Sequence, residues 1–212
     1  MKLRRDLPVL THKFRWWLSV NSGKMASVIT HVFNPALIAA FTFLTLLYPY
    51  NSSSPILVEI SLTFGTIIPL ATVYVMSKRG MISDFLVANK DERAKPFAGA
   101  ILSYVLGSLA LWSLRAPKLA TALMLCYAGN TIIMMLITRL WKISVHASGI
   151  AGPTTALIEA FGAWVSILFL LLIPVGWARI RLKAHTPSQI LAGALVTIIA
   201  TWLQFGIYLA VL

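Results

Sequence analysis

Long apolar stretches recur along this chain from about residue 27 to its end, and they limit what it can fold into. Several are long enough to cross the roughly 30 Å hydrocarbon core of a bilayer, which takes about 20 helical residues. The composition agrees, because 58% of the 212 residues are hydrophobic and only 11% are charged. Lipid cannot satisfy exposed backbone polar groups, so helices are favoured. The sequence predicts an all-α polytopic membrane bundle with about six to seven transmembrane helices.

The expected crossings are separated by short polar connections. They lie at about 28–47, 56–76, 97–114, 119–137, 146–162, 163–178 and from 186 to the C-terminus. The apolar region between 146 and 178 is too long for one crossing, so a break is expected near Gly162. We therefore divide the chain into a basic interfacial N-terminal segment, residues 1–26, and a transmembrane domain, residues 27–212. A disordered basic tail is the alternative for the first segment.

The charge of the chain points to a membrane partner. The formal net charge is +12, but the cations are distributed among the connections between apolar stretches. Anionic lipid headgroups therefore fit better than nucleic acid. The single cysteine, Cys126, lies inside a predicted span, which excludes an internal disulfide and a cysteine-rich metal site. We expect neither a metal nor a cofactor.

One polar stretch near the C-terminus carries the strongest chemical signal. Three cations come shortly before His185, namely Arg179, Arg181 and Lys183. A new helix is predicted to begin after Thr186, where Gln189 completes a Thr-x-x-Gln capping box. His185 therefore lies just before a helix N-terminus, where free N–H groups and the helix dipole favour an anion. This local chemistry indicates a phosphate site.

This stretch resembles the third motif of the phosphatidic acid phosphatase type 2 superfamily, in which an arginine precedes a histidine by six positions. Arg179 and His185 match the two motif residues, and Gln189 stands where the family has an aspartate. A glutamine oxygen is still able to accept a hydrogen bond from the imidazole and fix its tautomer, although it cannot stabilise an imidazolium as a charge would. A capping role alone is the alternative for Gln189.

Two upstream segments are similar to the other motifs of the same family, in the family's order. Residues 142–149 resemble the Pro-Ser-Gly-His motif, with Ser144 and His146 on matching positions. The proline and first glycine of that motif are replaced here by Ile143 and Val145. Residues 90–96 resemble the first motif, a lysine followed by arginine and proline. The three candidates for phosphate binding in that segment are Lys90, Arg93 and Lys95.

The resemblance implies a two-step hydrolysis without metal. His185 would attack phosphorus, and His146 would protonate the leaving group and then activate water. Arg179 would hold phosphoryl oxygens with its planar guanidinium group, and Ser144 would contribute to the phosphate site. The plainer readings are an interfacial His185, a core His146 and a solvated loop around Lys90.

The predicted topology places the three motif segments together. With seven crossings, the N-terminus and the loops at 77–96, 139–146 and 179–185 fall on one side of the membrane. Of the 18 lysine and arginine residues, only Arg115 and Lys118 then lie on the opposite side. The positive-inside rule therefore predicts a site on the cytoplasmic face of the cell membrane.

Three functions are compatible with these features. The leading prediction is an integral-membrane lipid phosphatase whose substrate is a lipid phosphate or a polyprenyl (isoprenoid) mono- or diphosphate. A membrane prenyl- or phosphoalcohol transferase would need clustered aspartates for Mg²⁺, and here only Asp84 and Asp91 are near one another. A non-catalytic lipid-binding or transport protein on the same scaffold is the third possibility.

Overall fold

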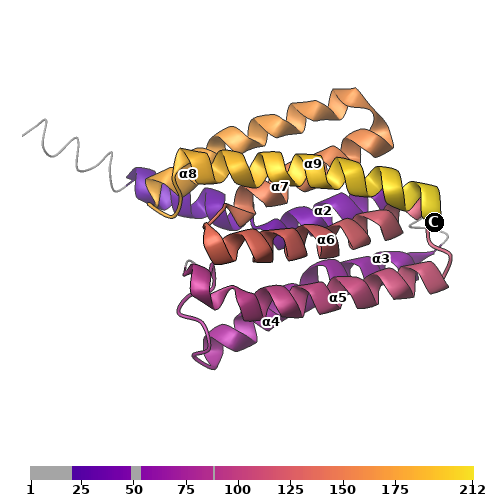
Figure 1. The fold of residues 1–212 in the computed structure, drawn as a ribbon, viewed down its shortest axis with the longest axis horizontal. Coiled ribbons are helices and arrows are strands. Elements are labelled where there is room, and N and C mark those ends of the chain that lie inside the picture. Colours follow the sequence, from indigo (N-terminus) through magenta and orange to yellow (C-terminus); the bar gives the residue numbers. More distant parts are fainter. Residues whose placement is uncertain (1–20, 49–53, 88) are drawn as a thin grey trace, which may run out of the picture.

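The computed structural model describes residues 21–48, 54–87 and 89–212, and within these ranges the chain is helical and contains no strand (Figure 1). This confirms the all-α bundle expected from the apolar stretches. The first helix, Asn21–Val32, meets α2 (Pro35–Leu47) at a bend of 44°. It begins several residues before the predicted start of the first span. Most of the predicted N-terminal segment, residues 1–20, lies outside the described residues.

The remaining elements follow in chain order. They are α3 (Pro55–Leu62), the π-helical turn η2 (Thr63–Ile67), α4 (Ile68–Lys78), the 3₁₀ turn η3 (Lys90–Glu92), α5 (Ala94–Ser113), α6 (Lys118–Leu140), α7 (Val145–Phe161), the 3₁₀ segment η4 (Ala163–Leu171), α8 (Leu172–Arg181) and α9 (Pro187–Val211). In the described part of the chain, five continuous helices are long and apolar enough to cross a membrane, and the bent pair adds a sixth if it counts as one span. The crossing expected at 146–162 corresponds to α7, which has 17 residues and is buried along most of its length.

The predicted break in the longest apolar region is confirmed at Gly162. This residue ends α7 and has φ of +95°, in the left-handed region that glycine enters without a steric penalty. The chain then continues as η4 and α8, which together form one of the candidate spans. One apolar stretch in the sequence is therefore two separate segments in the fold.

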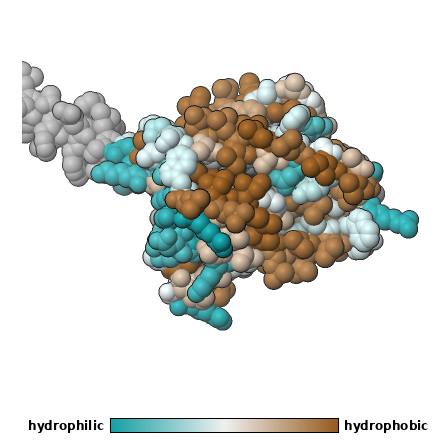
Figure 2. Space-filling view, in the orientation of Figure 1, coloured by the Kyte–Doolittle hydropathy of each residue, from teal (hydrophilic) through white to brown (hydrophobic). Residues whose placement is uncertain are grey.

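The helices pack as neighbours around α7. Helix α5 lies along α6, and α7 packs against both α2 and α9. Large apolar side chains cover much of the outer surface, as the brown area in Figure 2 shows. An exposed apolar surface of this extent marks a membrane or interaction surface. The helices and their surface are compatible with an integral membrane protein.

The three motif segments meet at one end of the bundle, on the left in Figure 1, whereas the C-terminus lies at the other end. Two hydrogen bonds join these segments. The Arg93 Nη1 donates to the Ile143 carbonyl oxygen at 3.1 Å, and the Ser144 N–H donates to the Gln189 carbonyl oxygen at 3.1 Å. The expectation that segments distant in sequence share one side of the bundle is therefore confirmed.

Candidate active site

Four buried side chains from four helices converge at this end. Arg93 precedes α5, His146 is in the first turn of α7, Arg179 is in the last turn of α8 and His185 lies just before α9. Each is at most 6% exposed. The charges of Arg93 and Arg179 act on both imidazoles, and each imidazole also lies within electrostatic range of the other. The site is therefore a buried, positively charged cluster that contains two histidines.

The end of α8 determines how Arg179 and His185 approach each other. Lys183 has φ of +54°, and the N–H groups of Lys183 and Ala184 donate back to the carbonyls of Ile180 and Arg179 at 2.9 and 3.0 Å. This is the hydrogen-bond pattern of a Schellman C-cap, which reverses the chain at a helix end. The His185 N–H then also reaches the Arg179 carbonyl, at 3.3 Å. Six residues of sequence are thus folded into one tight turn.

Gln189 makes the contacts that both of its alternative roles require. Its Oε1 accepts the Thr186 backbone N–H at 3.1 Å, and the Thr186 hydroxyl accepts the Gln189 N–H at 3.4 Å, so the predicted capping box is present. The same Oε1 lies 3.3 Å from the Nδ1 of His185. An Nδ1–H that donates to this oxygen leaves the Nε2 lone pair of His185 available for another group.

The start of α7 is held against α9, which brings His146 close to His185. The Ser144 hydroxyl accepts the Ala147 N–H at 3.3 Å and caps α7. Gly193 of α9 lies against Ser144, and a Cβ at this position would be 2.6 Å from the Ser144 carbonyl oxygen. Only glycine permits this approach of α7 to α9 without a shift. Ser144, predicted to bind phosphate, is fully buried and serves as a helix cap in this structure.

Arg93 is the one cation of the first motif that reaches the two histidines. Its Nε donates to the Val87 carbonyl at 3.0 Å, and its Nη1 donates to Ile143. Burial, and then the charge of Arg179, lower the pKa of Arg93 to about 10. The guanidinium nevertheless remains charged at neutral pH. These two bonds fix its position between the loop before α5 and the loop before α7.

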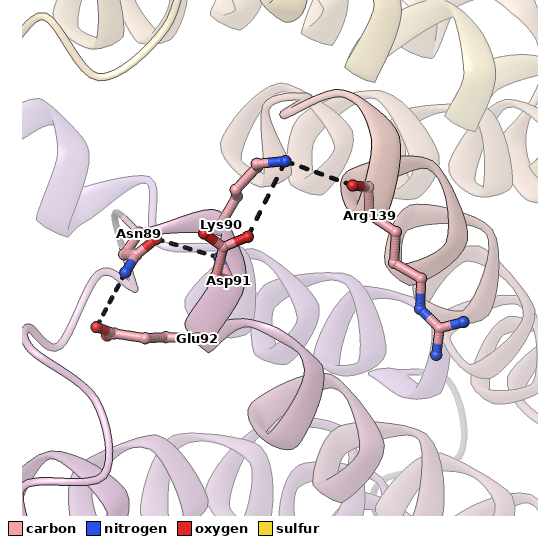
Figure 3. Close-up of polar contacts among 5 residues, drawn as sticks. All are labelled: Asn89, Lys90, Asp91, Glu92 and Arg139. Atoms are coloured by element: carbon pink, nitrogen blue, oxygen red, sulfur yellow. Dashed lines mark hydrogen bonds and ion pairs between the residues drawn. The ribbon is translucent and has the colours of Figure 1, made fainter.

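The other two candidates of the first motif point elsewhere. Figure 3 shows the Lys90 ammonium group pointing to the end of α6, where it donates to the Arg139 carbonyl at 3.4 Å and lies 4.0 Å from Asp91. Lys95 is exposed on the first turn of α5. The structure therefore does not bring Lys90 or Lys95 to the histidines, and it resolves which of the three cations joins them.

Arg179 has an unusual set of contacts for a buried arginine. It is only 2% exposed, yet its Nε and Nη1 have no hydrogen-bond partner. The Nε2 of His146 is also buried without a partner, whereas the ring has a hydrogen bond to the Thr30 backbone. Buried polar groups are nearly always satisfied, and an unpaired buried charge is costly. The open Nε and Nη1 donors of the charged Arg179 indicate a site for an anionic ligand.

The environment keeps His185 neutral. Burial, then the charges of Arg179, Arg93 and Lys142, lower the pKa of His185 to about 3, and only the hydrogen bond with Gln189 acts in the opposite direction. At neutral pH the ring therefore carries a lone pair rather than a proton on one nitrogen. A neutral imidazole is the form that attacks phosphorus.

Two site residues were missed as binding candidates in the sequence. Asp84 acts electrostatically on Arg93, Lys142 and Arg179. Its Oδ1 also accepts the Leu86 N–H at 2.8 Å, within the loop that contacts Arg93 through Val87. Burial, then the charges of Arg93 and Arg179, lower the pKa of Lys142, which confirms that it belongs to this cluster. The sequence could have indicated Asp84 as a partner of the site cations, because the chain has only six acidic residues and this one lies in a loop that contains several lysines and arginines.

The described residues contain no group of three or more His, Cys, Asp or Glu side chains that could hold a metal ion. Asp84 and Asp91, the pair considered for a transferase, have different neighbours. Asp84 lies near the buried arginines, and Asp91 faces Lys90.

No protein-family model, curated protein or solved structure matches this chain. We therefore infer a function from the geometry of the site and the order of its motifs.

Proposed function

We propose that this chain is an integral-membrane lipid phosphatase that hydrolyses a lipid phosphate or an isoprenoid mono- or diphosphate through a phosphohistidine. The observation that carries the proposal is the buried, partly unpartnered guanidinium of Arg179 beside two histidines. A tetrahedral phosphoryl group supplies acceptors to Arg179 and places a phosphorus atom within reach of an imidazole. Arginine is well suited to this contact, because its planar fork matches two phosphoryl oxygens.

In the first step, the Nε2 lone pair of His185 attacks phosphorus. A P–N bond forms while the P–O bond to the lipid breaks, and His146 donates its proton to the leaving oxygen. Gln189 holds the Nδ1–H of His185 and so keeps the lone pair on Nε2. Arg93 and Arg179 stabilise the charge on the equatorial oxygens.

In the second step, water replaces the histidine. His146, now neutral, takes a proton from the water as its oxygen attacks phosphorus. The P–N bond breaks, its electron pair returns to His185, and inorganic phosphate leaves with both histidines in their starting states. This route uses only groups of the chain, and it needs His146 protonated when the substrate is bound. The phosphate dianion between the arginines favours that proton.

We place the site on the cytoplasmic face of the cell membrane. Among the residues that the structure describes, all lysines and arginines except Arg115 and Lys118 belong to segments at its end of the bundle, and cytoplasmic connections are enriched in these residues. Protease protection of a tag inserted between Arg115 and Lys118, in spheroplasts and in inverted vesicles, tests this orientation.

A non-catalytic lipid-binding protein is the second candidate, and one observation favours it. Gln189 stands in place of a carboxylate, so no adjacent negative charge supports an imidazolium at His185. Binding without turnover would give lipid phosphate affinity with no phosphate release.

The test is a phosphate-release screen with the protein in lipid nanodiscs. The substrates are phosphatidic acid, phosphatidylglycerol phosphate and polyprenyl mono- and diphosphates, with EDTA present. We expect release from at least one of them and a loss of at least about 10³-fold in His185→Ala. His31→Ala is the matched control, because His31 is exposed and bonds only to Ser27 of its own helix at 2.8 Å. Activity that requires a metal, or that persists in His185→Ala, would refute the proposal.

A further inference from the structure

A cavity of about 170 Å³ adjoins the candidate active site. Arg93 and His146 line it, whereas Arg179 and His185 do not. Most of the other lining residues are apolar and come from α2, α4, α5 and the loop before η3. The site thus has an apolar compartment on one side only, the side of His146.

This compartment continues into the bundle. A second cavity of about 80 Å³ shares lining residues with the first, among them Pro35, Phe97 and Tyr104. It lies against α6, α7 and α9, where Leu123, Gly152 and Thr201 also line it. The two cavities are therefore neighbours that share a wall, and His146 lines only the first of them.

Small and irregular elements create the first cavity. Ala36 and Ala100 line it and leave space between α2 and α5. On the α4 side, the π-helical turn η2 is followed by Pro69, which also lines the cavity and has no N–H to continue the helical ladder. The Thr66 hydroxyl donates to the Ala36 carbonyl at 3.1 Å and holds this wall to α2.

We infer that this cavity binds the first part of a single hydrocarbon chain, the one attached to the oxygen that leaves phosphorus. This inference rests on the proposed function. His146 protonates the leaving oxygen, so the chain on that oxygen must start beside His146. In-line displacement puts the nucleophile and the leaving group on opposite sides of phosphorus. The cavity fits this arrangement, because His146 lines it and His185 lies outside it.

The size of the cavity favours one chain over two. At about 170 Å³ it is smaller than the pockets of roughly 300–1,000 Å³ that enclose whole drug-sized ligands. A chain of isoprenoid or straight-chain type would place its first carbons inside and extend its remainder along the second cavity or into lipid. The type of chain, rather than its full length, is then sensed close to the reacting phosphorus.

The test fills the cavity with a side chain from α5. Ala100→Phe narrows it, and Ala98→Phe is the matched control, because Ala98 is exposed on the same helix. The substrates are farnesyl phosphate, decyl phosphate and the soluble p-nitrophenyl phosphate. We expect Ala100→Phe to raise KM for one or both chain-bearing substrates by at least about tenfold and to change kcat/KM for p-nitrophenyl phosphate less than about twofold. A loss confined to farnesyl or to decyl phosphate identifies the chain type that the cavity accepts.

Ala36→Leu, on the opposite wall, repeats the test with a smaller side chain in case Ala100→Phe does not fold. Equal effects of Ala100→Phe and Ala98→Phe, or equal losses on all three substrates, would overturn the inference. Binding of decylphosphonate and methylphosphonate to the same variants separates this inference from the catalytic proposal. If no substrate is hydrolysed, a decyl-to-methyl affinity ratio that falls in Ala100→Phe alone still supports the cavity, and an unchanged ratio refutes it.

Discussion

Two polar clusters lie inside this apolar bundle, and they differ in how well their hydrogen bonds are satisfied. Between α6 and α9, Asn130 donates to Thr201 at 2.8 Å and accepts from Gln204 at 2.9 Å, and Tyr208 donates to Gln204 at 3.3 Å. At the charged end, Arg179 and His146 keep buried atoms without partners. A satisfied network joins helices, whereas an open one is arranged for a ligand. The difference is the one expected between a network that joins helices and the phosphate site that we propose.

The largest expected effect comes from the open cluster. Arg179→Met should reduce phosphate release by about 10²–10³-fold, because one preorganised donor to the reacting oxygens is lost. It should change the melting temperature little, because removing two buried donors without partners offsets the loss of the attraction between Arg179 and Asp84. Activity and thermal unfolding of the same preparation measure both.

Arg181→Met is the control on the same helix. Arg181 donates through Nε to Ser22 at 2.8 Å, on the first helix. Its loss should change activity less than about threefold. A strongly destabilised Arg179→Met would show that Arg179 holds the fold together, contrary to the comparison.

Gln189 contacts His185 and also caps α9. Its removal should therefore lower both kcat and stability, with a smaller effect on kcat than the loss of Arg179. Gln189→Ala should lower kcat by about 10–100-fold, because an unsupported imidazole loses its tautomer and orientation. It should also cost about 1 kcal/mol of stability through the capping box. Gln189→Glu keeps an acceptor for Thr186 and His185 and should restore kcat. Loss of stability without loss of kcat would reduce Gln189 to a helix cap.

A change in the Asn130 cluster, whose hydrogen bonds are satisfied, should reduce stability rather than activity. Asn130→Ala removes two interhelical hydrogen bonds and should cost about 1–2 kcal/mol of stability. Release of phosphate from the soluble p-nitrophenyl phosphate by the folded fraction should change less than about threefold, because Asn130 lines the second cavity and not the charged end. A severe loss of activity at full stability would mean that this network also serves catalysis, and the contrast between the clusters would fail.

Acidification should produce the smallest effect. The folded pKa of His185 is about 3, below its unfolded value of about 6.5, so the unfolded chain binds more protons between these values. Stability contributed by neutral His185 is therefore present above pH 6.5 and decreases as the pH falls toward 3. The melting temperature of the wild type should fall more between pH 7 and pH 5 than that of His185→Ala. Parallel curves would contradict a lowered pKa.

Much of the fold could be predicted from the sequence, because burial in lipid follows apolar runs. The helical class and the break at Gly162 were expected, and the structure confirms them. The described residues hold five continuous candidate spans and a sixth in the bent pair, which is the lower end of the expected six to seven. The 17-residue α7 is not among these candidates and is buried along most of its length.

The site could be predicted only in part. Motif order and topology predicted that His146, His185 and Arg179 would meet, and the structure brings them together. The choice of Arg93 over Lys90 depends on the Val87 and Ile143 carbonyls that hold it, and Ile143 is 50 residues away in the sequence. Asp84 approaches Lys142 in the same way, through a loop conformation that local sequence does not encode.

Trapping the phosphoenzyme is the most direct test of a phosphohistidine at His185. The protein in nanodiscs is mixed with lipid labelled with ³²P in its phosphate, quenched in base within the first turnover and digested for peptide mapping. We expect a base-stable label on the peptide that contains His185. The label should be absent in His185→Ala and strongly reduced in Arg179→Met. Phosphate release without any label on this peptide, or a label that survives the loss of His185, would contradict a phosphohistidine at this position.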